Sequence, residues 1–139
     1  MSEKKLISVV MSCFNNEKSI QSSVESILNQ SYHEFEFLIV DDCSEDNTFE
    51  ILNYLKSKDE RIKLFKNDKN IGLTKSLNFL ISKSHGEYIA RQDADDISKN
   101  NRFEIQINNI LNYKLDACAT RASVIGSRRI VPNFSYYLP

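Results

Sequence analysis

The stretch "EFEFLIVDDCSEDNTFEILNYLKSK", residues 34–58, predicts a β-strand followed directly by an α-helix. Its first seven residues are almost continuously apolar, which is typical of a central strand covered on both faces. Phe49, Leu52 and Leu55 then recur at a spacing of three, as on the buried stripe of a helix. Only a short polar turn separates the two segments, so the stretch has the form of half a βαβ unit.

The same alternation extends along the chain in both directions. Short apolar runs predict further strands at residues 6–11, 61–65, 87–91 and 117–125. Apolar residues on one face predict three further helices: Ile20, Val24, Ile27 and Leu28; Leu73, Leu77, Leu80 and Ile81; Phe103, Ile107, Ile110 and Leu111.

Capping signals support these helices. Asn15 and Asn16 are N-cap candidates of the first helix, and Gly72 opens the third, which contains Leu73 and Leu77. Gly86 is expected to end that helix in the left-handed conformation that glycine tolerates best.

The order of elements predicts an α/β fold: a Rossmann-like, mostly parallel sheet with right-handed crossovers and helices on both faces. Residues 1–139 are expected to form a single domain. Ligands of such sheets bind beyond the carboxyl ends of the strands. The search for a site therefore concentrates on the polar segments that follow the strands, at residues 12–17, 41–47, 66–72 and 92–96.

Composition narrows the function classes. The chain carries 18 Lys and Arg against 19 Asp and Glu, a net charge of −1, whereas nucleic-acid binders normally carry a basic excess. The apolar run near the N-terminus is too short for a signal peptide, and no stretch approaches the ~20 apolar residues of a membrane span. Three cysteines without metal-site spacing favour a reducing cytoplasm.

The strand end at residues 92–96 contains the most acidic cluster. If the strand persists, Asp93 and Asp95 lie on the same side of it, and Arg91 shares their parity and could pair with Asp93. Two convergent carboxylates suit Mg²⁺ or Mn²⁺ completed by water and substrate phosphates. The alternative is an acidic helix N-terminus favoured by the macrodipole, which Asp96 fits well.

The other strand ends lack the glycine-rich turn of a dinucleotide or P-loop site. Asp41 and Asp42 are either turn or cap residues, or one of them accepts the ring N–H of a base. Phe14 is either a core aromatic or the face on which that base stacks. Lys75 is a surface lysine unless a diphosphate lies beside the start of its helix. Together these features outline a nucleotide-sugar site.

Three ordered stretches at these strand ends carry a family resemblance: "ISVVMSCFNNEKSIQSSVESILNQSYHEFEFLIVDDCSEDNT" (7–48), "NDKNIGLTKSLNFLI" (67–81) and "GEYIARQDADDISKNNRFEIQ" (86–106). The chain resembles the inverting glycosyltransferase family two, which has the GT-A fold, over residues 6 to about 126.

The resemblance implies a role for each site residue. Ser12 and Phe14 would lie in the loop that holds the base, and Asp42 would bond the base ring N–H. Lys75 would approach the diphosphate. Asp93 would lie against the ribose or donor sugar and with Asp95 form the metal site, Asp95 ligating the cation.

Several departures from the family pattern qualify the resemblance. Cys43 stands where many members have Gly, Phe14 where Tyr is usual, and Asn100 where Pro often occurs. The family's acceptor site and catalytic base belong to a later part that is not recognisable after Ile125. We therefore expect the nucleotide-binding half of a transferase, and a truncated chain is one interpretation of this.

The expected function is metal-dependent, inverting transfer from a UDP- or GDP-sugar to a glycan or lipid-linked acceptor hydroxyl. The family setting implies cell-surface polysaccharide synthesis in a bacterium. The expected location is the cytoplasm, and the inner face of the membrane is compatible with this setting. The alternative is a non-catalytic nucleotide-sugar-binding fragment or pseudoenzyme. A receiver-like phosphoacceptor domain is disfavoured because the first strand ends in "SCFNNE" rather than in an acidic pocket.

Overall fold

The computed structural model describes residues 5–120, 122 and 123. The chain divides into two compact units, residues 1–100 and 101–139, which are described separately. The first unit contains the sheet and all the residues singled out above as site candidates. The second contains α4 (Arg102–Tyr113).

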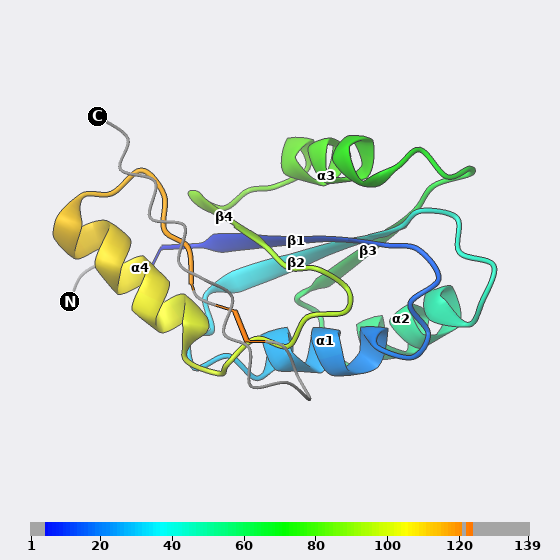
Figure 1. Cartoon of the computed structure of the whole chain (residues 1–139), viewed down its shortest axis with the longest axis horizontal. Helices are drawn as coiled ribbons and strands as arrows, with labels where there is room; N and C mark the ends of the chain where they lie inside the picture. Colours follow the sequence, from blue (N-terminus) through cyan, green and yellow to red (C-terminus); the bar gives the residue numbers. More distant parts are fainter. Residues whose placement is uncertain (1–4, 121, 124–139) are drawn as a thin grey trace. The chain divides into compact units, whose positions relative to one another are not determined.

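The first unit is built on a four-stranded sheet. Its strands are β1 (Ile7–Cys13), β2 (Phe35–Asp41), β3 (Ile62–Lys66) and β4 (Tyr88–Arg91). They lie in the order β3-β2-β1-β4, and every neighbouring pair is parallel (Figure 1). The central strands β1 and β2 pair in register over their whole lengths. The expected parallel α/β sheet is confirmed.

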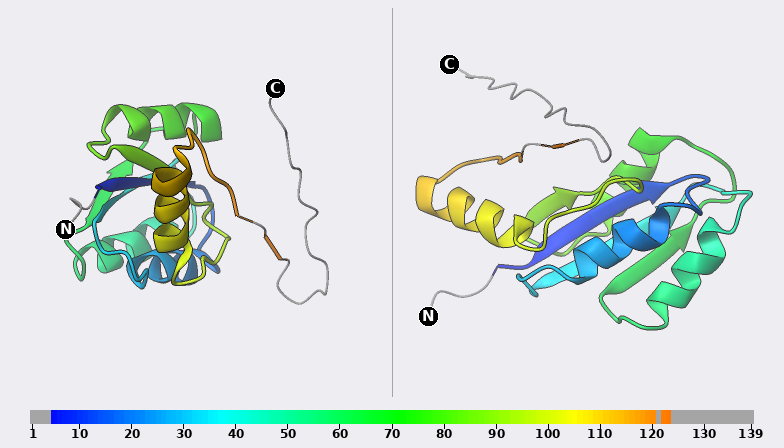
Figure 2. Two further views of the ribbon diagram at one scale, coloured as in Figure 1. Left: turned by 90° about the vertical axis from the view of Figure 1, so that its left-hand side faces the viewer. Right: turned by 60° about the horizontal axis from the view of Figure 1, so that its bottom comes forward.

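Helices cover both faces of this sheet, as predicted. Figures 1 and 2 show α3 (Leu73–Ser82) on one face, and α1 (Ile20–Leu28) and α2 (Thr48–Lys56) on the other. Under α3, the fully buried Val10, Leu38, Val40 and Leu80 form a core cluster with the partly buried Phe65, Leu77 and Phe79. The rings of Phe65 and Phe79 meet edge to face, with centroids 5.3 Å apart.

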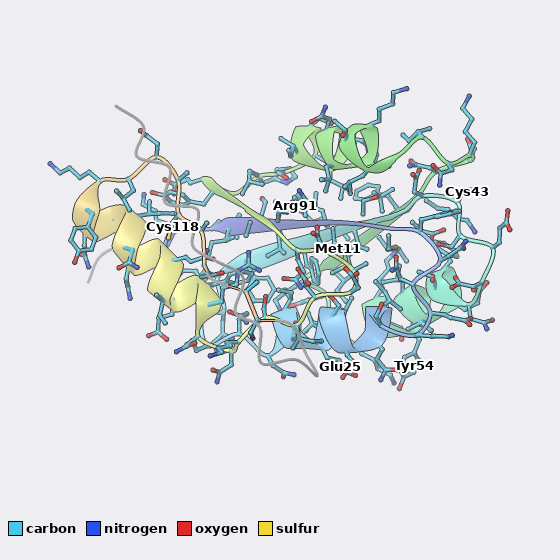
Figure 3. All side chains as sticks on the ribbon, viewed as in Figure 1. Met11, Glu25, Cys43, Tyr54, Arg91 and Cys118 are labelled. Atoms are coloured by element: carbon cyan, nitrogen blue, oxygen red, sulfur yellow. The ribbon has the colours of Figure 1, made fainter. Side chains whose placement is uncertain are left out.

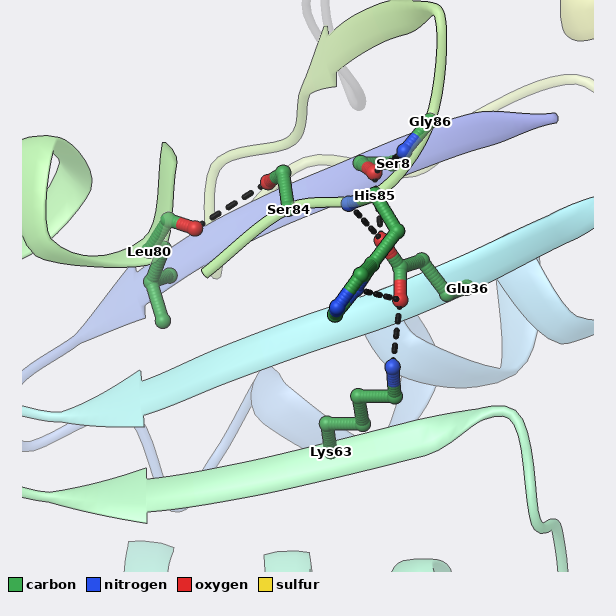
Figure 4. A network of polar contacts seen from close by, with 7 residues as sticks. All are labelled: Ser8, Glu36, Lys63, Leu80, Ser84, His85 and Gly86. Atoms are coloured by element: carbon green, nitrogen blue, oxygen red, sulfur yellow. Dashed lines mark hydrogen bonds and ion pairs between the residues drawn. The ribbon is translucent and has the colours of Figure 1, made fainter. Parts of the chain in front are cut away.

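A cluster of polar side chains connects the strands near their amino-terminal ends (Figure 4). The buried carboxylate of Glu36 accepts hydrogen bonds from Ser8 Oγ (2.6 Å), the backbone N–H of His85 (2.6 Å) and Lys63 Nζ (2.5 Å). Ser8 Oγ in turn accepts from the N–H of Gly86 at 2.8 Å. Although burial by itself raises the pKa of Glu36, these hydrogen bonds outweigh it and lower the pKa to about 2. We call Ser8, Glu36, Lys63, His85 and Gly86 the Glu36 cluster.

Three details of the predicted elements are wrong or incomplete. Gly86 does not have a positive φ; a Cβ there would lie 2.5 Å from the backbone nitrogen of Ser8, so close approach and not a left-handed cap requires glycine. The strand predicted at residues 117–125 is not formed by residues 117–120, and Ser123 forms only an isolated bridge. Residues 121, 124 and 125 lie outside the described residues. β4 ends at Arg91, earlier than the parity argument for Asp93 and Asp95 requires.

In the second unit, α4 confirms the fourth predicted helix. Phe103 and Ile107 are its buried residues, and Lys114 follows it in the left-handed conformation with φ of 52°. The helix does not begin directly after Asp96, because residues 97–101 precede its first turn. Asp96 is therefore not at a helix N-terminus.

Candidate functional site

The strand order locates the candidate site. From β1 to β3, each strand is added next to the previous one on the same side of β1, and β4 is then added on the other side of β1. This reversal is a topological switch point, and in open α/β sheets the crevice beyond the strand ends at such a point is the usual ligand site. The segments after β1 and β4, which contain Phe14, Asp93 and Asp95, begin on either side of it.

Reciprocal hydrogen bonds join the β1–α1 and β2–α2 loops. The N–H of Asn15 donates to Ser44 Oγ (2.9 Å), and in return Asn15 Oδ1 accepts from the N–H of Glu45 (2.9 Å). The N–H of Asn16 donates to Thr48 Oγ1 at 2.8 Å. A similar exchange connects the next residue, since Glu17 N–H donates to Asp46 Oδ2 (3.1 Å) and Glu17 Oε2 accepts from Asn47 N–H (3.2 Å). The two loops therefore form one fixed surface.

Phe14 projects from this surface. Its side chain is 43% exposed, so it is not the core aromatic of the alternative interpretation. Its backbone N–H donates to Asn16 Oδ1 at 2.9 Å, which shows that the Asn16 side chain shapes the loop and does not cap α1. Ser12 lies two residues before Phe14, within β1. It pairs with Val40 of β2 and is half-buried. An exposed ring on a fixed loop is suited to stacking on a planar ligand.

Asp42 is nearly enclosed, with 2% of its surface exposed. Its Oδ1 accepts from Asn67 Nδ2 (2.7 Å) and from the N–H of Ile71 (2.9 Å), and its Oδ2 accepts from the N–H of Gly72 (2.8 Å). Burial by itself raises the pKa of Asp42, but these hydrogen bonds outweigh it and hold the pKa below its ordinary value. The carboxylate is thus ionised, and it ties the end of β2 to the loop that enters α3.

These contacts leave limited capacity on Asp42. A carboxylate offers about four acceptor positions. Asn67, Ile71 and Gly72 use three of them, and the Ser76 hydroxyl adds a further hydrogen bond that lowers the Asp42 pKa. Asp42 therefore has a structural role that its position in the sequence did not reveal, and a ring N–H of a ligand would have to share the carboxylate with these donors.

Asp41 serves the turn that follows β2. It is fully buried, and its Oδ2 accepts from the N–H of Ser44 at 3.2 Å. The thiol of Cys13 donates to the carbonyl of Val40 at 3.5 Å and lies 3.9 Å from Asp41 Oδ1. Burial, followed by the negative charge of Asp41, raises the pKa of this thiol. Cys13 is therefore a protonated, structural cysteine.

Cys43, labelled in Figure 3, occupies the turn where the family usually has glycine. Its φ of 66° lies in the left-handed region, which explains that preference for glycine and shows that the cysteine side chain is accommodated at some cost in strain. Lys75 is exposed in the first turn of α3, close in sequence to Gly72 and Ile71, which bind Asp42.

The acidic strand end forms a turn. The N–H of Asp96 donates to the carbonyl of Asp93 at 3.2 Å, so Asp93 to Asp96 make one turn after β4 and not a continuation of the strand. Asp95 is exposed and Asp93 half-buried. The predicted pairing is confirmed: Arg91 Nε and Nη2 donate to the two oxygens of Asp93 at 2.8 and 3.1 Å.

The turn fits a divalent cation in its chemistry. Within the part of the chain that the structure describes, no three His, Cys, Asp or Glu side chains gather as a complete metal site. Magnesium and manganese do not need one, because one or two carboxylates with water and substrate phosphates complete their shells. Arg91 already pairs with both carboxylate oxygens of Asp93, so a cation there would have to share Asp93 with this guanidinium or displace it. Asp93 and Asp95 are the residues that would hold the cation.

Sequence reasoning missed the supports of these groups. Asn67 holds Asp42. The segment that contains Asp93 and Asp95 is held by the buried side chains of Ser23, Gln30 and Gln92 and by the partly buried Ser26. A signal for the latter was present. Ser23, Ser26 and Gln30 share the helical spacing of an apolar stripe, which indicates a polar face buried against another segment.

The fold matches that of a solved protein, S. aureus TarS. The crystal structure of S. aureus TarS 1-349 superposes with a TM-score of 0.82 and 27% identity, covering 91% of this chain and 38% of TarS. TarS 1-349 has also been solved in complex with UDP-GlcNAc, and that structure matches with a TM-score of 0.72 and 28% identity, over 78% of this chain and 32% of that one. The expected GT-A fold is thereby confirmed.

Curated proteins show the same likeness. EpsE of Bacillus subtilis (strain 168), provisionally named a glycosyltransferase, is 44% identical over 73% of this chain and 37% of its own length. WfgD of Escherichia coli, a UDP-Glc:alpha-D-GlcNAc-diphosphoundecaprenol beta-1,3-glucosyltransferase, is 35% identical over 93% of this chain and 50% of its own length. The chain thus spans half or less of the length of these relatives.

Two further findings bear on identity. Among residues 5–120, 122 and 123, no helix has both the length and the apolar character needed to cross a membrane. The family model described as "Glycosyl transferase family 2" matches residues 8–134, which is most of the sequence. Because that match includes every strand of the sheet and each strand-end segment of the candidate site, the chain belongs to glycosyl transferase family 2.

Proposed function

We propose that this chain is the donor-binding part of a metal-dependent, inverting glycosyltransferase that uses a UDP- or GDP-sugar. One observation carries the proposal. At the carboxyl ends of the strands, an exposed aromatic ring (Phe14), an ionised carboxylate (Asp42) and an acidic turn (Asp93 to Asp96) follow adjacent strands. These groups match the base, the ring N–H and the metal-bound diphosphate of a nucleotide sugar.

Each residue has a role in this proposal. The base stacks on Phe14 beside Ser12 and donates its ring N–H to the Asp42 carboxylate. Asp93 and Asp95 hold a Mn²⁺ or Mg²⁺ ion, with Asp93 also lying against the ribose or sugar. Lys75 approaches the diphosphate from the start of α3. The bound cation supplies positive charge where the leaving nucleoside diphosphate becomes more negative.

The transfer itself requires an acceptor hydroxyl to attack the anomeric carbon in line, which breaks the bond to the diphosphate and inverts that centre. A general base must take the hydroxyl proton, and we assign it to no residue of this chain. The relatives are two or more times longer than their matched parts. The second candidate is a nucleotide-sugar-binding fragment or pseudoenzyme without turnover.

The acceptor class is a proposal by analogy with one relative. WfgD is named for transfer to a diphosphoundecaprenol-linked sugar. A lipid-linked or glycan acceptor in bacterial cell-surface polysaccharide synthesis, reached from the cytoplasm at the inner face of the membrane, is in keeping with that name. Binding to the membrane would then be peripheral. Donor hydrolysis with and without lipid-linked acceptor separates the enzyme from the non-catalytic candidate.

The decisive experiment is calorimetric titration of the chain with UDP, CDP and pyrophosphate, in Mn²⁺ and in EDTA. UDP offers a ring N–H to Asp42, whereas CDP presents a bare acceptor nitrogen to the carboxylate. A hydrogen bond to a charged group contributes about 1.5–3 kcal/mol, so UDP should bind at least about tenfold more tightly than CDP. Pyrophosphate should bind in Mn²⁺ but not in EDTA.

The unmodified protein is the best material for this comparison. In Asp42→Asn, an amide in place of one oxygen would face a donor, either Gly72 N–H or the pair from Asn67 and Ile71. The variant would therefore disturb the loop as well as the base. Equal affinity for UDP and CDP would refute the role of Asp42, and equal UDP binding in Mn²⁺ and EDTA would refute the metal.

A further inference from the structure

Gln92, the residue directly before Asp93, is a buried amide with 3% of its surface exposed. Its Nε2 donates to the carbonyl of Asp96 (2.8 Å) and lies 3.3 Å from the carbonyl of Asp93, the two residues that close the acidic turn. Its Oε1 accepts from Ser98 Oγ at 2.7 Å. Since the two carbonyls can only accept, the amide nitrogen must face them. One side chain therefore holds both ends of the turn.

Helix α1 supports the same segment from one face. Ser23 Oγ donates to the carbonyl of Asp93 at 3.0 Å, and Ser26 Oγ accepts from the N–H of Ser98 at 3.0 Å. Just beyond the C-cap of α1, Gln30 Nε2 donates to the carbonyl of Lys99 at 2.7 Å. Contacts from α1 and from the residue that follows its C-cap therefore hold the backbone of residues 93–99.

The contacts divide the segment into two parts. Gln92 and Ser23 act on the carbonyls of Asp93 and Asp96, which flank the exposed Asp95. Gln30 acts on Lys99, beyond the turn. A cation held by two carboxylates needs both side chains to start from fixed backbone positions, because otherwise binding must bear the cost of ordering them.

We propose that Gln92 is a positioning residue for the cation: it holds the turn in the shape that brings Asp93 and Asp95 to one metal ion, with Ser23 as its second support. This inference rests on the proposed donor site. Partners that orient metal ligands typically contribute about 10–100-fold to metal affinity. Gln92 contacts no ligand in this scheme and acts only through the turn.

The test measures Mn²⁺ binding in the presence of saturating UDP, with the electron paramagnetic resonance signal of free Mn²⁺ as the readout. It compares the parent with Gln92→Met and with the matched control Gln30→Met. Both variants remove a buried amide that holds a backbone carbonyl, so both should lower the unfolding midpoint similarly. Gln92→Met should weaken Mn²⁺ binding about 10–100-fold, while Gln30→Met should remain near the parent. Ser23→Ala, a milder change, should weaken it by a smaller factor and serves if Gln92→Met does not fold.

The outcomes distinguish failure of the role of Gln92 from failure of the proposed function. Equal weakening by Gln92→Met and Gln30→Met would mean that both amides are merely structural, and the inference would be overturned. Unchanged Mn²⁺ affinity in folded Gln92→Met, or in Ser23→Ala if that variant is the one that folds, would overturn it as well. If the parent chain took up no Mn²⁺ with UDP, the proposed function would fail first.

Discussion

The Glu36 cluster allows a stability prediction whose size follows from the structure. Glu36 is buried at the amino-terminal edge of the sheet and accepts hydrogen bonds from Lys63, Ser8 and the His85 amide. Against the burial that raises it, these bonds lower the pKa of Glu36 from 4.5 to about 2. One pKa unit corresponds to about 1.4 kcal/mol, so the ionised group stabilises the fold by about 2–3 kcal/mol once solvent screening of the partly exposed Lys63 is allowed for.

The direction in which stability changes with pH follows from the linkage between proton binding and folding. A carboxyl whose pKa is lower in the folded state stabilises the protein fully above its unfolded pKa, near 4.5, and loses that contribution as the pH falls toward the folded pKa of about 2. Glu36→Gln cannot ionise, and its amide would present a donor where Lys63 or the His85 N–H now donates. The variant should therefore be less stable than the parent by about 2–3 kcal/mol near neutral pH.

The assay is urea unfolding of parent and variant from about pH 7 to about pH 3, where the difference between them should shrink steadily as the pH drops below about 4.5. Taking a difference is necessary because Asp42, Asp46 and Asp59 also have lowered pKa values and contribute to acid sensitivity in both proteins. Glu60→Gln, the same change at an exposed position, is the control and should be nearly neutral. A parent–variant difference that stayed constant across this range would refute the ionised Glu36 cluster.

Two further changes test the site directly. Asp95→Ala, at an exposed position of the turn, should abolish cation-dependent UDP binding in calorimetry while shifting the unfolding free energy in EDTA by no more than about 0.5 kcal/mol; a large loss of stability in EDTA would make the acidic turn structural. Cys43→Gly should relieve a left-handed residue that costs about 1–2 kcal/mol, offset by about 0.4–1 kcal/mol of chain entropy, whereas Cys43→Val should destabilise; urea unfolding that ranked Val above Gly would refute the strain.

The pattern of apolar residues predicted the four strands, the four helices and the parallel sheet, because the central strands β1 and β2 are almost wholly buried and each helix buries part of its apolar face. It also predicted a strand at residues 117–125 that residues 117–120 do not form. Conclusions that depended on where a strand stops were less secure. The side-by-side placement of Asp93 and Asp95 assumed a longer β4, but the strand ends at Arg91 and a turn takes over. Gly86 was identified as a special position for the wrong reason, since the crowding comes from Ser8, 78 residues away in the sequence.

Polar partners were the part that sequence could not supply. Nothing local connects Asp42 to Asn67 and to Gly72, because the loop that brings them together follows a different strand. Glu36 stands in an otherwise apolar strand, and its acceptable burial depends on three donors from three separate segments. Residues that form hydrogen bonds between distant segments have no regular spacing in the sequence. Such pairs therefore cannot be predicted from a sequence pattern.

Burial divides the residues of the candidate site into enclosed and exposed groups, and this division has a consequence for mutagenesis. Asp42 and Gln92 are almost wholly enclosed by contacts within the protein, whereas Phe14, Lys75 and Asp95 are exposed beyond the same strand ends. Substituting an enclosed group leaves buried partners unsatisfied, so it lowers stability and binding together. Substituting an exposed group removes a ligand contact and leaves the fold nearly unchanged. A site formed only by chance on the surface would show no such division, because its exposed residues would rest on no satisfied polar framework.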